Sequence, residues 1–117
     1  MTVTPQQIID GMAEKNRLLT DKNDESEALS EKMADAERSY NKALAKRMIA
    51  LKIEGQNITL IEKIAKGDDT VADLKYASDV ATGVYKASLS RIKSITIAID
   101  TYRSLLAWQK AEMLRTE

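Results

Sequence analysis

Apolar residues recur at helical spacing through the first half of the chain. Between Ile8 and Leu51 they return at intervals near three or four residues, or at sums of these, as one face of a helix requires. The members of this stripe are Ile8, Met12, Leu19, Leu29, Met33, Tyr40, Leu44, Met48 and Leu51. Thr4 can cap such a helix, and Pro5 suits its first position because the missing N–H costs nothing there. The pattern predicts a first helix over residues 5–54.

A polar segment, TDKNDESEA, interrupts this stripe between Leu19 and Leu29. Either a solvent-exposed helix continues through the segment, or the chain turns near Asn23 and Asp24. We favour one continuous or slightly kinked helix, because the helical pattern is strong again from Leu29 to Ile53.

Two glycines punctuate the middle of the chain, in the segment IEGQNITLIEKIAKGDD. Gly55 is expected to end the first helix, since glycine enters the left-handed backbone region without Cβ strain. Thr59 and Glu62 fit a capping box, which predicts a short helix over residues 59–66. Gly67 is expected to close this short helix in the same way.

The second half of the chain predicts a long helix over residues 70–115, capped by Asp68 or Asp69. Its stripe consists of Leu74, Ala77, Ala81, Val84, Ser88, Ile92, Ile95, Ile99, Tyr102, Leu106 and Met113. Small side chains dominate the first half of this helix, and isoleucines and larger groups dominate the second. Small side chains let a partner helix approach closely.

Two long helices joined by a compact corner must run antiparallel. The predicted fold class is therefore all-α: one domain over residues 1–117, forming a long antiparallel helical hairpin with a short helix at the corner. Folding the chain about this corner places Leu51 beside Leu74. It also places Tyr40 near Tyr85.

A two-helix hairpin buries only one stripe per helix, which is thin support for 117 residues. Large apolar residues that lie partly off the stripes are Ile49, Ile53, Ile97, Leu105 and Trp108. They can pack against the short helix or form a second seam with another copy. We expect a homo-oligomer, most simply an antiparallel dimer that makes a four-helix bundle. The alternative is a monomer whose N-terminal segment folds back as a third helix from a break near residues 20–24.

The composition removes most catalytic chemistry. There is no Cys and no His, so cysteine nucleophiles, zinc–thiolate sites and the commonest acid–base catalyst are absent. A phosphate-binding loop of the Walker type is rejected, because the glycines are too far apart and no strand precedes them. We expect no enzyme activity and no cofactor. Asp68, Asp69 and Asp73 are an alternative hard-cation site, although aspartate at a helix start is ordinary.

Charge and hydropathy indicate a soluble chain. Basic and acidic residues balance at 18 each. No apolar run approaches the roughly 18 residues that a membrane span needs, and the start MTVTPQQ lacks the basic and apolar blocks of a signal peptide. We expect a cytoplasmic protein without a membrane partner.

Two sets of residues are candidates for contact with a partner. The first set is basic, and Arg38, Lys42 and Lys46 within it share one helix face. With residues expected on the facing helix, the set is Arg38, Lys42, Lys46, Arg47, Lys86, Arg91 and Lys93. It resembles a nucleic-acid track, but the neutral chain and the lack of a reading motif favour protein contact. The second set comprises candidate interface anchors: Tyr76, Tyr85, Ile97 and Trp108.

Three segments together resemble a known family: PQQIIDGMAEKN at the start, ALKIEGQNITLIEKIAKGD in the middle and AIDTYRSLLAWQKAEM at the end. They look like short, mostly uncharacterised early-region proteins of phages and prophages of Gram-positive bacteria. The resemblance covers nearly the whole chain but includes no catalytic motif. It implies an accessory protein inside a bacterial host cell.

These observations favour a non-enzymatic phage accessory protein that binds a host or phage protein stoichiometrically. Inhibition of a host defence system, as by anti-CRISPR proteins, or of a replication factor is one form of that activity. The alternatives are a nucleic-acid-associated replication or recombination factor, and an oligomeric sponge for a small anionic ligand.

Overall fold

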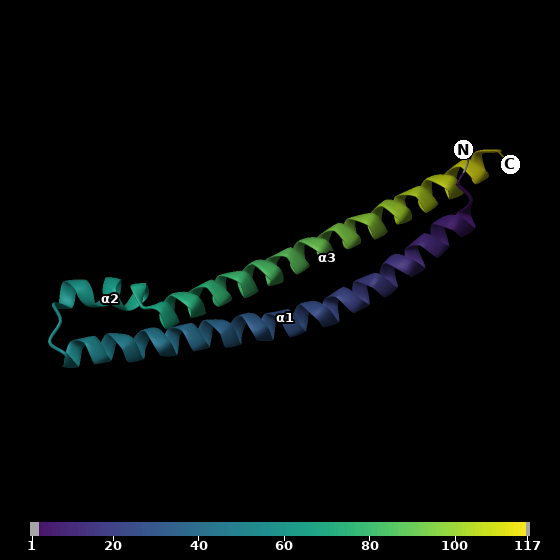
Figure 1. Cartoon of the computed structure of the whole chain (residues 1–117). Coiled ribbons are helices and arrows are strands. Elements are labelled where there is room, and N and C mark those ends of the chain that lie inside the picture. The colour runs from purple at the N-terminus through teal and green to yellow at the C-terminus, as the bar shows by residue number, and fades with distance from the viewer. Residues whose placement is uncertain (1–2, 117) are drawn as a thin grey trace. The chain divides into compact units, whose positions relative to one another are not determined.

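The computed structural model describes residues 3–116, and they form three α-helices (Figure 1). Helix α1 runs over Pro5–Ile53, α2 over Ile58–Gly67 and α3 over Asp69–Thr116. No described residue lies in a strand. The all-α prediction is therefore confirmed, with α1 packed against α3 as a hairpin. Each helix begins and ends within one residue of its predicted bounds.

The chain divides into two compact units that share α1 and α3. The terminal unit combines residues 3–26 of the chain with residues 87–116. The corner unit consists of residues 27–86 and includes the whole of α2. In each unit a segment of α1 packs against a segment of α3, so each is described on its own below.

Helix α1 starts with a reciprocal pair of capping hydrogen bonds. The backbone N–H of Gln7 donates to the Thr4 hydroxyl at 3.2 Å, as the prediction of Thr4 as N-cap requires. The backbone N–H of Thr4 donates to Gln7 Oε1 at 2.9 Å. Thr4 and Gln7 thus form a capping box that we did not expect from the sequence. Because Pro5 has no N–H, the helix start has three unpaired N–H groups, and two of them are satisfied in this way.

The polar segment after Leu19 is helical throughout, so the prediction of a continuous α1 is confirmed. The Thr20 hydroxyl donates to the carbonyl of Asn16 at 3.2 Å, one turn earlier. Lys22 Nζ lies 2.9 Å from Glu25 Oε2 across the next turn. Such local pairs stabilise a helix whose outer side is fully polar. The alternative of a third helix that folds back from residues 20–24 is wrong.

At the corner, Gly55 ends α1 as predicted, with a φ of 85° that favours glycine. The predicted capping residue of α2, Thr59, is wrong. The N-cap is Asn57, whose Oδ1 accepts from the backbone N–H of Thr59 at 3.1 Å. Thr59 lies inside the first turn and Glu62 pairs with Lys66 instead. Asparagine competes well for this position because its short side chain reaches the first free N–H groups.

The predicted glycine stop at Gly67 is also wrong. Gly67 is the last helical residue of α2 and has no positive φ. The chain turns at Asp68, which has extended backbone angles of φ −62° and ψ 134°. Asp68 Oδ2 then accepts from the backbone N–H of Val71 at 3.2 Å, as the N-cap of α3. One residue therefore ends one helix and caps the next.

The register in the corner unit differs from the predicted one. Leu51 packs with Ile61 and Ala65 of α2, not beside Leu74. Helix α2 packs along the end of α1, in the place where the prediction puts the start of α3. Tyr40 consequently lies beside Lys75, with Lys75 Nζ 5.2 Å from the ring centroid. The shift relative to the predicted pairing with Tyr85 is about ten residues, or about three helical turns.

Most of the buried and half-buried residues of α3 are spaced alternately three and four residues apart. In the corner unit they include Val71, Leu74, Ser78, Ala81 and Tyr85, and in the terminal unit Ser88, Ile92, Ile95, Ile99, Tyr102, Leu106 and Gln109. This is the seven-residue repeat of a coiled-coil seam. The predicted stripe ran close to it, but its members Ala77, Val84 and Met113 are exposed. The predicted stripe follows the spacing of an isolated helix, which is less regular than the seven-residue repeat.

In the terminal unit, α1 and α3 approach closely at a glycine. A Cβ atom added to Gly11 would lie 2.8 Å from Cζ of Tyr102. Glycine here lets the tyrosine ring rest on the α1 backbone. Nearby, Gln109 Nε2 donates to the carbonyl oxygen of Val3. Both contacts join residues at the start of the chain to residues near its end.

Candidate interaction surfaces

The corner unit carries an apolar surface that the hairpin leaves uncovered. We call it the corner surface and define it by Ile49, Ile53 and Ile58. Ile53 and Ile58 are 81% and 79% exposed, and Ile49 is exposed as well. Isolated exposed aliphatic residues are normal, but Ile49 of α1 and Ile58 of α2 line one groove, and Ile53 is exposed one helical turn from Ile49.

Helical periodicity explains why these isoleucines face solvent. Leu51 turns inward onto α2 and is only 2% exposed. Its neighbours two positions away, Ile49 and Ile53, therefore point away from the direction of Leu51, and both are exposed. On α2, Ile61 and Ala65 are buried against α1.

A groove runs across the corner surface. Its volume is about 320 Å³. It is lined by Met48, Ile49, Lys52, Ile58, Ile61 and Glu62. Two ionisable residues thus lie in an otherwise apolar lining. A groove of this kind accepts large apolar side chains from another protein, while the charged groups contribute orientation.

The acidic group of this groove is held by an ion pair. Lys66 Nζ lies 2.8 Å from Glu62 Oε1, one turn along α2. The hydrogen bond and the charge of Lys66 lower the pKa of Glu62 below its ordinary value. The same pair raises the pKa of Lys66. Both side chains are exposed, so the pair is screened by solvent and contributes little to folding.

The predicted basic set is divided by the structure. Arg38, Lys42 and Lys46 are exposed on α1 in the corner unit. Arg47 is half-buried, and its Nε lies 3.6 Å from Asp68 Oδ1. Arg47 is thereby engaged at the junction of α2 and α3. Its position indicates a structural role.

The remaining basic residues do not face the α1 lysines, so that part of the prediction is wrong. Lys86 is exposed near the boundary of the corner unit, whereas Arg91 and Lys93 belong to the terminal unit. The charge of Arg91 contributes there to the lowered pKa of Glu25, after the larger effect of the Lys22 hydrogen bond and charge. These residues do not face the α1 lysines because α3 is shifted along α1 relative to the predicted register.

The four predicted anchors fall into two classes. Tyr76 is exposed on α3 in the corner unit, and Ile97 and Trp108 are exposed on α3 in the terminal unit. Tyr85 is half-buried at a position of the α3 seam, which indicates packing within the hairpin. Three of the four side chains are therefore available to a partner.

The terminal unit has a second groove, of about 430 Å³. It is lined by Pro5, Arg103, Leu106, Ala107, Gln109, Lys110 and Met113. Gln109 Oε1 is buried there without a hydrogen-bond partner. Its walls come from the start of α1 and the last turns of α3.

The described part of the chain holds neither a cluster of metal-ligating residues nor a helix that could span a membrane. Among residues 3–116, no three Asp or Glu side chains gather closely enough to hold a metal ion. Asp68, one member of the proposed cation site, instead accepts from Val71 and pairs with Arg47. Within the same residues, no helix has the length and apolarity that crossing a membrane requires.

Comparison of the chain with protein-family models, with curated proteins and with solved structures gives no match in any of the three. Functional argument therefore rests on the surfaces themselves. Sequence reasoning had singled out Ile49 and Ile53 but not Ile58 or the groove. The missing signal was the position of α2 along α1, which brings Ile49 and Ile58 to one groove.

Proposed function

We propose that this chain is a non-enzymatic accessory protein that binds another protein stoichiometrically through the corner surface. The observation that supports this most is the groove of about 320 Å³, which is lined by Ile49 and Ile58, 60% and 79% exposed. Exposed apolar patches rimmed by charged groups are typical of protein–protein contacts. The partner segment is an amphipathic helix or strand whose apolar side chains enter the groove.

The phage setting is part of the same proposal. It rests on the resemblance of the three quoted segments to early-region proteins of phages and prophages. In that setting the partner is a host or phage protein inside the bacterial cell, and inhibition of a defence or replication factor is the form of activity that we favour. The absence of Cys and His from the chain supports binding over catalysis.

The test is affinity capture from infected host cells, followed by titration with the purified partner. Ile53→Asp and Ile58→Asp place a charge in the corner surface and are expected to weaken binding by about 100-fold. Leu89→Asp is the matched control, because Leu89 is an exposed aliphatic residue of α3 outside this surface. A partner that binds all three variants equally would refute the proposal for the corner surface.

Nucleic-acid contact is the second candidate, and the exposed lysine face of α1 favours it. Arg38, Lys42 and Lys46 lie on successive turns and are all exposed. A track of three phosphate contacts would give a slope near −3 in the logarithm of affinity against the logarithm of salt. Titration of single- and double-stranded DNA with the wild type and with Arg38→Glu/Lys42→Glu measures it. If the wild type shows a steep slope and the double variant does not, nucleic-acid binding becomes the leading function in place of protein binding.

A further inference from the structure

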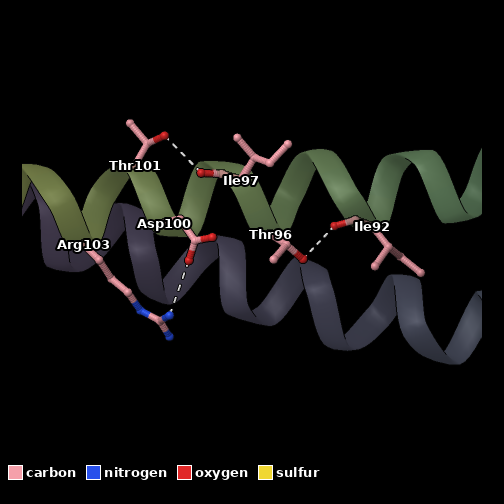
Figure 2. Close-up of polar contacts among 6 residues, drawn as sticks. All are labelled: Ile92, Thr96, Ile97, Asp100, Thr101 and Arg103. Carbon is pink, nitrogen blue, oxygen red and sulfur yellow. Dashed lines mark hydrogen bonds and ion pairs between the residues drawn. The ribbon is translucent and has the colours of Figure 1, made fainter.

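In the terminal unit, α3 carries a second seven-residue repeat, offset by two residues from the buried seam. Its members are Ala87, Ser90, Ser94, Ile97, Thr101, Ser104, Trp108 and Ala111, all of them exposed. They are spaced alternately three and four residues apart, and none is charged. Figure 2 shows two of them, Ile97 and Thr101, pointing away from α1. We call this stripe the outer seam.

The polar members of the outer seam are suited to burial. Ser94 Oγ donates to the carbonyl of Ser90 at 3.1 Å, and Thr101 Oγ1 donates to the carbonyl of Ile97 at 3.0 Å (Figure 2). These hydroxyl donors are satisfied within α3 itself. Covering Ser94 and Thr101 with another helix therefore leaves neither of these two hydroxyl donors without a partner, which is the usual cost of burying such groups.

The exposed area of the chain leaves room for such a contact. The chain exposes 8756 Å². A compact monomer of its 13.0 kDa would expose about 6300 Å². The excess of about 2400 Å² exceeds the roughly 800 Å² per partner that a standard protein interface buries.

We propose that the outer seam is the interface of an antiparallel homodimer, in which α3 packs against α3 of a second copy. A helical stripe without charges and with the 3–4 spacing of a coiled coil is the surface that another helix of the same repeat covers. Small residues alternate with Ile97 and Trp108, which permits close approach and insertion of the larger side chains. The proposal goes beyond the proposed function and is independent of it.

Charge on the flank of the outer seam selects the orientation and the register. Lys93 and Asp100 lie on the same flank of α3, seven residues apart. When Ser94 of one copy lies opposite Ile97 of the other, Lys93 of each copy lies opposite Asp100 of the other. A slip of one heptad in one direction brings Lys93 opposite Lys93, and a slip in the other brings Asp100 opposite Asp100. Only one of these three antiparallel registers has two attractive pairs and no repulsive one.

Sedimentation equilibrium of the full chain tests the proposal. The expected result is a dimer mass, twice the 13.0 kDa of the chain, with a monomer–dimer equilibrium on dilution. The fluorescence of Trp108, the single tryptophan, is expected to shift to shorter wavelength on dimerisation as its side chain loses water. A mass of 13.0 kDa at every concentration would overturn the proposal.

Variants make the test specific. Ile97→Asp is expected to raise the dimer dissociation constant by about 100-fold, whereas Leu89→Asp, off the seam, leaves it unchanged. Circular dichroism checks that Ile97→Asp stays helical. Each single reversal, Lys93→Asp or Asp100→Lys, is expected to weaken the dimer by about tenfold, and the double reversal to restore it within about threefold.

The double reversal separates this register from other assemblies. Restoration requires that position 93 of one copy meet position 100 of the other, which neither a parallel pair nor a slipped pair provides. Failure of the double reversal to recover affinity would overturn the antiparallel register. Equal weakening by Leu89→Asp and Ile97→Asp would overturn the outer seam as the interface. Loss of partner binding with an intact dimer would instead contradict only the proposed function.

Discussion

Truncation of Leu51 tests the packing of the corner unit. Leu51 is 2% exposed and packs in one cluster with Ile61 and Ala65. Leu51→Ala removes three carbon atoms, which at about 0.8 kcal/mol each corresponds to about 2.4 kcal/mol of lost transfer free energy. The cavity that remains adds to this, and measured Leu→Ala changes in cores span about 2–5 kcal/mol. Because α2 is a short helix that can settle into the space, we expect about 3 kcal/mol.

The assay is urea and thermal unfolding followed by circular dichroism. A loss of about 3 kcal/mol corresponds to a fall in Tm of roughly 10–15 °C for a chain of this size. Ile53→Ala is the matched control, because Ile53 is two residues away on the same helix but 81% exposed. It is expected to change the free energy of unfolding by less than about 0.5 kcal/mol. Equal losses in the two variants would refute the assignment of inward and outward faces.

A double-mutant cycle then tests the register. Leu51→Ala combined with Ile61→Val is expected to show a coupling of at least about 0.5 kcal/mol, because the two side chains share one core cluster. Leu51→Ala combined with Leu74→Ala is expected to be additive within about 0.5 kcal/mol. The reverse result would support the pairing that the sequence had suggested and refute the observed position of α2.

Three further predictions concern the helix ends and the ion pair of α2. Asn57→Ala is expected to destabilise the chain by about 1 kcal/mol in urea unfolding, whereas Thr59→Ala costs clearly less, since Asn57 is the N-cap. Asp68→Ala is expected to cost about 1–2 kcal/mol in the same assay and Asp68→Asn less, because asparagine can still cap α3; an Asn variant as unstable as the Ala variant would contradict this. The pair of Glu62 and Lys66 stabilises the chain only while both are charged: its contribution is lost as pH falls below 4.5 through the lowered pKa of Glu62, and as pH rises above 10.5 through the raised pKa of Lys66. In the variant Lys66→Met, the pKa of Glu62 measured by NMR titration is expected to return toward 4.5. An unchanged pKa would refute the ion pair between Glu62 and Lys66.

Features set by neighbours in the chain could be predicted from the sequence. Thr4, Gly55 and Asp68 act at helix ends as their side chains or backbone freedom suggest. The continuity of α1 also followed from its pattern. The errors at Thr59 and Gly67 concern which of two adjacent competent residues ends or begins a helix. Small differences in free energy decide such choices.

The register and the candidate surfaces depended on contacts between distant segments. The sequence pattern assigned Leu51 to an inward face but did not specify that α2, and not α3, would cover it. Because the prediction paired Leu51 with α3 and not with α2, it expected Tyr40 beside Tyr85 where the structure has Lys75. It also placed Arg91 and Lys93 opposite the lysines of α1. An antiparallel pair keeps its repeat when it slips by whole heptads, so periodicity alone cannot fix the register.

The two joints of the hairpin differ in how much change they can absorb. Between α1 and α2 the chain has Glu54, Gly55, Gln56 and Asn57, all exposed, and this loop offers a place for an inserted tag or a protease cut. Between α2 and α3 there is only Asp68, which serves both helices at once. With no spare residue at that joint, α2 cannot turn about its own axis without twisting the first turn of α3. A rotation of α2 caused by binding at the corner surface would therefore also move the first turn of α3.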